Sequence, residues 1–122
     1  MDLPPHSRRT RDLVARGRAA GVIILATQRP THQVIDTSMR DLFGYRWAFR
    51  CTTDSSSDAV LGQGWANDGS TAVDIDPMAR GVGWLLSGDR RPRRIKSAYL
   101  TDEEVAYLAA YAAKLRRGAE AA

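Results

Sequence analysis

Residues 21–30 (Gly-Val-Ile-Ile-Leu-Ala-Thr-Gln-Arg-Pro) constrain the fold more than any other stretch of this chain. A strand with one solvent-exposed face alternates apolar and polar residues. An unbroken Val/Ile/Leu run bounded by turn residues is instead typical of a parallel strand buried on both faces. Pro30 ends the run, because proline cannot donate to a sheet ladder. The stretch therefore predicts a central parallel strand. Its carboxyl end, where open α/β sheets bind ligands, carries Thr27, Gln28 and Arg29.

The remaining sequence predicts helices and strands in an α/β order, with one domain at 8–117, an irregular lead-in at 1–7 and a tail at 118–122. Capping residues and apolar spacing set the expected elements. They are a helix at 8–20 capped by Ser7 and ended by Gly21, a short helix at 37–43, a strand at 45–51, a helix from the Thr52–Ser55 cap to Leu61, a long connection at 63–80, a hairpin at 82–87 and 94–100, and a helix from the Thr101 capping box to about Arg117.

Three packing predictions follow from the same patterns. Trp47 and Phe49 alternate with Arg46 and Arg50, so we expect the aromatic pair in the core. The two arginines then share the other face, as a salt-bridged pair or as a contact for a phosphate or a neighbouring subunit. The apolar stripe of the last helix is expected to be buried; it comprises Val105, Leu108, Ala109, Ala112 and Leu115.

The block Ala26–Pro30 (ATQRP) resembles a segment of the FtsK/SpoIIIE family of bacterial DNA-translocating ATPases. Residues 16–21 and 46–50 are similar to its flanks, and 81–86 looks closest to the plasmid-transfer, TraB-like branch. The resemblance covers roughly Leu13 to Ala113. It implies the C-terminal half of a RecA-like P-loop NTPase domain, with a mainly parallel sheet, a terminal hairpin and a C-terminal helix.

The same resemblance implies catalytic roles for two residues and nucleotide contacts for the strand tip. Gln28 would sense the γ-phosphate or the attacking water, with Thr27 and Arg29 beside it; alternatively its amide only satisfies loop backbone groups. Arg18 would act as the arginine finger that reaches the neighbouring subunit's phosphates. Arg16 could be the finger instead, or either arginine could be part of a solvated helix face.

A basic turn is the candidate DNA contact. Its arginines, which could track backbone phosphates or simply be solvated, are Arg90, Arg91, Arg93 and Arg94. The net charge of +4 and the pI near 9.7 suit a phosphate partner but do not specify one. The resemblance implies double-stranded DNA and neighbouring subunits of a hexameric ring as partners.

Nucleotide hydrolysis in this family uses ATP and Mg²⁺, held by a Gly-x-x-x-x-Gly-Lys-Ser/Thr loop and an acidic strand end. The sequence contains neither motif, so we expect no cofactor and no ATPase activity for this chain alone. His6 and His32 lack the neighbours of a zinc site, so no metal is expected. A non-catalytic module that caps or inhibits a full translocase, or a plain basic DNA-binding protein, are the alternative functions.

The compartment and the solution behaviour follow from simpler features. Cys51 is the one cysteine and can form no internal disulfide, which suits a reducing cytoplasm. No apolar run approaches the roughly 18 residues that span a bilayer, so any membrane attachment would come from parts that this sequence does not contain. Strands that lack their neighbours leave an exposed sheet edge, and we expect poor solubility or oligomerisation.

Overall fold

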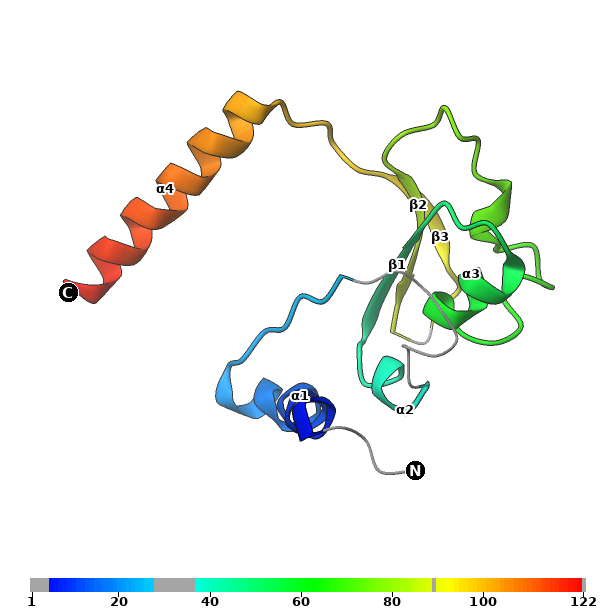
Figure 1. The fold of residues 1–122 in the computed structure, drawn as a ribbon, viewed down its shortest axis with the longest axis horizontal. Coiled ribbons are helices and arrows are strands. Elements are labelled where there is room, and N and C mark those ends of the chain that lie inside the picture. The colour runs from blue at the N-terminus through cyan, green and yellow to red at the C-terminus, as the bar shows by residue number, and fades with distance from the viewer. Residues whose placement is uncertain (1–4, 28–36, 89, 122) are drawn as a thin grey trace.

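A three-stranded antiparallel sheet forms the centre of the computed structural model, which describes residues 5–27, 37–88 and 90–121 (Figure 1). Its strands β1 (Tyr45–Phe49), β2 (Val82–Ser87) and β3 (Arg93–Lys96) lie in the order β1-β2-β3. The hairpin of β2 and β3 confirms the prediction. The expected parallel sheet is not shown among the described residues, where β1 pairs antiparallel with β2 and is the edge strand. The reason is topological, since the α3-containing segment 50–81 brings the chain back in the opposite direction.

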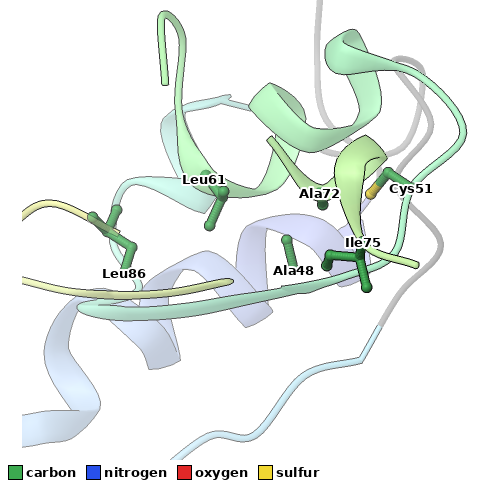
Figure 2. Close-up of a cluster of buried hydrophobic side chains, with 6 residues drawn as sticks. All are labelled: Ala48, Cys51, Leu61, Ala72, Ile75 and Leu86. Atoms are coloured by element: carbon green, nitrogen blue, oxygen red, sulfur yellow. The ribbon is translucent and has the colours of Figure 1, made fainter. Parts of the chain in front are cut away.

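One face of the sheet is covered by helix α3 (Asp54–Leu61) and the 3₁₀ turn η2 (Ala72–Asp74). Figure 2 shows the small core between them. It consists of Ala48, Cys51, Leu61, Ala72, Ile75 and Leu86. Leu61 is fully buried and projects from α3 toward the sheet. The 63–80 connection therefore contributes Ala72 and Ile75 to the core, although the sequence predicted a long connection there and no core residues.

Polar side chains of α3 hold this connection in place. Thr53 caps the helix by accepting from the amide of Ser56, as predicted, and Gly62 ends it at a φ of 120°. The Asp58 carboxylate then accepts from the amides of Gly64 and Ala66, both at 3.0 Å. Because the first residues after α3 are tied back to α3 itself, the connection returns over the helix toward the sheet.

Three further hydrogen bonds fix η2 in the core. The buried hydroxyl of Ser57 accepts from the amide of Ala72 at 3.0 Å. Thr71 donates to the Asp54 carboxylate at 2.5 Å, and its hydroxyl also accepts from the amide of Val73. Ser57 has no exposed surface, so this bond satisfies a group that would otherwise be costly to bury.

The two faces of β1 are the reverse of the prediction. Ala48 is buried under α3, whereas Trp47 and Phe49 lie on the uncovered face, 38% and 51% exposed. The small side chain of Ala48 lets α3 approach the sheet closely. The Trp47 indole instead lies across Gly83 of β2, where a Cβ atom would collide with it. The expected burial of the aromatic pair is therefore wrong.

The segment before the sheet also departs from the prediction. Helix α1 (Pro5–Arg16) continues as the 3₁₀ turn η1 (Gly17–Ala20), and Gly21 ends it at a φ of 73°, as expected. Because α1 begins at Pro5, Ser7 lies within the helix and is not its cap. Residues 22–27 form no strand, and Ile23 is 95% exposed. A buried parallel strand needs neighbours on both edges and cover on both faces, and the described residues supply neither.

The remaining helices are α2 (Thr37–Arg40) and α4 (Asp102–Glu120). In Figure 1, α4 stands apart from the sheet at the end of the 97–101 linker. Its predicted capping box is present, but the predicted burial is wrong, because no described residue of α4 is buried. A stripe of this kind is buried only when a second element packs on it. Within the described part of the chain, no helix has the length and apolarity needed to cross a membrane.

The isolation of α4 gives a local prediction. Replacing Thr101 with Ala removes the bond that it accepts from the Glu104 amide at 3.2 Å, and should cost α4 about 1 kcal/mol. We expect helical circular dichroism to melt earlier while tryptophan fluorescence, which reports the sheet, is unchanged. Loss of both signals together would show that α4 and the sheet unfold as one unit.

Candidate functional site

The predicted nucleotide residues do not form a site within the described structure. Thr27 is exposed in the extended stretch after α1, and Arg18 is exposed in η1. Gln28 and Arg29 lie outside the described residues. Arg16 is paired with Asp12 at 3.3 Å, an exposed bridge within one helix turn. An exposed bridge of this kind adds little stability, and the choice of Arg18 over Arg16 as finger stays a prediction.

The four arginines of the predicted DNA contact lie around the β2–β3 hairpin but not on one face. Arg90 and Arg91 are exposed in the turn. In β3, Arg93 pairs across from Leu85 and Arg94 across from Trp84. Since neighbouring residues of a strand point to opposite faces, Arg93 lies on the uncovered face and Arg94 on the face that carries α3. The hairpin tip is therefore basic on both sides.

A charged cluster joins α2 to β1. Asp41 accepts from Arg40 Nε at 2.9 Å and from Arg46 Nη1 at 3.2 Å, and Arg40 Nη1 donates to the carbonyl of Asp58 at 3.3 Å. This confirms a salt-bridged role for Arg46. Arg50 follows the end of β1, is exposed and does not join the cluster. The sequence did not predict that Arg40 joins this cluster, because no spacing of residues in the sequence indicates that α2 lies against β1.

The cluster perturbs the titration of both partners. The hydrogen bond from Arg40 holds the pKa of the Asp41 carboxyl below its usual value, and the nearby charges of Arg40 and Arg46 act in the same direction. Burial, together with the charge of Arg40, lowers the pKa of Arg46. Arg46 Nε is buried without a hydrogen-bond partner among the described atoms. These contacts fit a structural clamp that fixes the start of β1.

The clamp predicts a weak acid dependence of stability. The pKa of Asp41 is lower in the folded state than in the unfolded state. The ionised carboxylate therefore stabilises the fold above the unfolded-state pKa, and this stabilisation is lost as pH falls through the folded-state pKa. The carboxylate is 58% exposed, so solvent screening limits the effect to less than about 1 kcal/mol. Asp41→Asn should lower stability at neutral pH and flatten the decline of urea midpoints below about pH 4. An unchanged acid slope would contradict the assignment.

The uncovered face of the sheet is the most distinctive surface and was missed by the sequence analysis. We name it the open sheet face. Its strand residues are Tyr45, Trp47, Phe49, Gly83, Leu85, Ser87, Arg93 and Ile95. Tyr45 is 75% exposed, and the rings of Trp47 and Phe49 stack at 4.8 Å with 28° between their planes. Alternation along β1 placed the aromatic side chains together but could not tell which face receives α3.

Thiol or metal chemistry finds no support in the described residues. Cys51 is buried and its thiol donates to the Phe49 carbonyl at 3.4 Å. Burial raises the pKa of this thiol, which disfavours the reactive thiolate. Among the residues that the structure describes, no group of three or more His, Cys, Asp or Glu side chains gathers as a metal site would require. Cys51 is thus a packing residue, as its sequence context indicated.

Comparison with known proteins gives one consistent relative. No protein-family model matches the chain. It is 32% identical over 94 residues to the DNA translocase FtsK of Corynebacterium glutamicum, 35% over 95 residues to that of Halalkalibacterium halodurans, and 31% over 102 residues to that of Agrobacterium fabrum. These matches cover 76–81% of this chain but only 9–11% of each relative. The chain thus corresponds to about a tenth of the length of these translocases.

Proposed function

Because this chain is homologous to a segment of the DNA translocase FtsK, we propose that it forms part of the motor domain of a double-stranded DNA translocase. The identity of 31–35% over most of the chain carries the proposal. The phosphate loop and the magnesium-binding acidic strand are absent from the sequence, so ATP hydrolysis would need residues supplied by another polypeptide segment.

The exposed apolar residues of 22–27 support the proposal that another polypeptide segment completes the motor domain. Val22, Ile23 and Leu25 are 43%, 95% and 92% exposed. Burying a side chain of this size stabilises a protein by about 1.5–3 kcal/mol, so leaving three of them in water forgoes a large driving force. We propose that 22–27 becomes a parallel strand of a RecA-like sheet once the nucleotide-binding half supplies its neighbours.

In that assembled motor the residues at the strand tip would meet the nucleotide. Gln28 would sense the γ-phosphate of ATP–Mg²⁺, with Thr27 and Arg29 alongside. Arg18 would complete the neighbouring subunit's site in a hexameric ring. The cargo would be plasmid or chromosomal DNA in a bacterial cytoplasm. The likeness of 81–86 to the TraB-like branch favours plasmid transfer.

The hairpin tip is the proposed DNA contact of this segment. Exposed arginines on both sides of a narrow β-ribbon can bridge backbone phosphates of a duplex, which gives salt-dependent affinity without sequence preference. The exposed members are Arg90, Arg91, Arg93 and Arg94.

A chimaera separates this function from its alternatives. The matched segment of Corynebacterium glutamicum FtsK is replaced by the corresponding residues of this chain, and ATP binding and duplex-stimulated ATP hydrolysis are measured for the chimaera and for this chain alone. We expect hydrolysis only in the chimaera. ATP binding by the chain alone would contradict the proposal. A chimaera without ATP hydrolysis, together with inhibition of intact FtsK by the added chain, would favour a non-catalytic module that caps the translocase.

A further inference from the structure

The open sheet face has the composition of a surface that stacks nucleobases. Tyr45, Trp47 and Phe49 alternate along β1, so their side chains emerge on one side about 7 Å apart. All three are exposed. Exposed aromatic side chains in a row on a sheet offer ring faces to unstacked bases, which bind them without sequence preference.

The aromatic row is held in place by its surroundings. Trp47 lies across Gly83, where any side chain would displace the indole, and Phe49 stacks on Trp47 at 4.8 Å. A preorganised ring loses little conformational freedom when a ligand stacks on it. Phe49, which remains 51% exposed, therefore presents a ring that is backed by Trp47.

The charges around the row match a polyanion. Arg93 is on the open sheet face, and exposed Arg90 and Arg91 lie in the turn at the Tyr45 end, where the amide of Gly88 donates to the Gly44 carbonyl. No carboxylate occurs among the strand residues of this face. The turn sequence also carries Asp89, so together with Arg90, Arg91 and Arg93 its net charge is positive, which attracts a phosphate backbone but not a purely apolar partner.

From these observations we infer that the open sheet face binds single-stranded nucleic acid, with bases on Tyr45 and Phe49 and phosphates at Arg93 and the turn arginines. A duplex cannot use the aromatic row, because its bases are already stacked and paired. The aromatic row thus separates this site from the duplex contact at the hairpin tip, although the two share Arg90, Arg91 and Arg93. Single-strand binding does not depend on the motor function proposed above.

Fluorescence anisotropy of a labelled short oligothymidylate with the full chain tests this site, with a duplex of equal length as the comparison. We expect Phe49→Ala and Tyr45→Ala each to weaken single-strand binding by about tenfold or more. Duplex binding should be unchanged. The matched control is Tyr107→Ala on α4, a 69% exposed aromatic away from the sheet, which should change neither. Arg93→Gln should lower the salt dependence of single-strand binding by about one phosphate contact.

Three results would overturn the inference. The first is single-strand binding that Phe49→Ala and Tyr107→Ala leave equally intact. The second is a parallel loss of single-strand and duplex affinity in the aromatic variants, which would reduce the site to phosphate contacts. The third is a chain that does not bind oligothymidylate but forms oligomers, which Phe49→Ala converts to monomers. That result would assign the open sheet face to contact with a second copy of the chain.

Discussion

Replacing Leu61 with Ala is expected to destabilise the sheet and its covering helix by about 2–5 kcal/mol. Leu61 is fully buried, and the core around it is small and partly built from alanines, which leave little material to fill a cavity. Domains are marginally stable, typically by 5–15 kcal/mol, so one such loss removes much of the total. Urea unfolding followed by the fluorescence of Trp65 and Trp84, which pack against the core, measures the change.

The control for that variant is Leu108→Ala. The chemical change is the same, but Leu108 is 47% exposed on α4, which does not pack on the sheet. We expect its urea midpoint to stay near that of the parent chain. Equal losses for both leucines would mean that α4 packs on the core in solution, contrary to the structure.

Replacing Gln28 with Ala is expected to reduce ATP hydrolysis by the FtsK chimaera by at least about a hundredfold, because in the proposed motor Gln28 senses the γ-phosphate or the attacking water. Arg18→Ala should have a loss of about a thousandfold or more, the effect of removing an arginine finger. Duplex binding should persist in both variants. Steady-state hydrolysis at saturating DNA, with equilibrium DNA binding measured in parallel, separates the two activities.

Two further variants serve as controls for these residues. Gln63→Ala removes an exposed glutamine in the connection after α3 and should leave hydrolysis unchanged. Arg16→Ala breaks only the exposed bridge to Asp12 and should cost little. A larger loss for Arg16→Ala than for Arg18→Ala would transfer the finger role to Arg16. Full activity of Gln28→Ala would remove the sensor role altogether.

Local signals in the sequence predicted local structure well. Thr53 and Thr101 cap their helices, and Gly21 and Gly62 end the elements before them. These predictions hold because a cap depends on hydrogen bonds within a few residues, whatever the rest of the chain does. The β2–β3 hairpin is local in the same sense.

Packing partners could not be predicted in the same way. An apolar run shows that burying the segment would be favourable, but it does not show which element covers the segment. The sequence therefore predicted 22–27 to be a strand of a sheet that the described residues do not form. The same limit explains the reversal of β1, where the alternation of Ala48 with Trp47 and Phe49 was clear but nothing local showed that α3 would cover the Ala48 face. For the site, Gln28 and Arg29 were predicted from their position after the apolar run and from a resemblance, and they lie outside the described structure. The open sheet face emerged only from strand pairing.

Hydrogen exchange of the amides of residues 22–27, measured in the chain alone and in the FtsK chimaera, tests most directly whether this segment obtains its sheet neighbours from elsewhere. We predict strong protection in the chimaera and fast exchange of residues 23–27 in the chain alone, where 22–27 form no strand. Val22 is the exception, because its amide already donates to the Gly17 carbonyl at 2.8 Å in the chain alone. Protection already present in the isolated chain, or fast exchange in an active chimaera, would contradict the account.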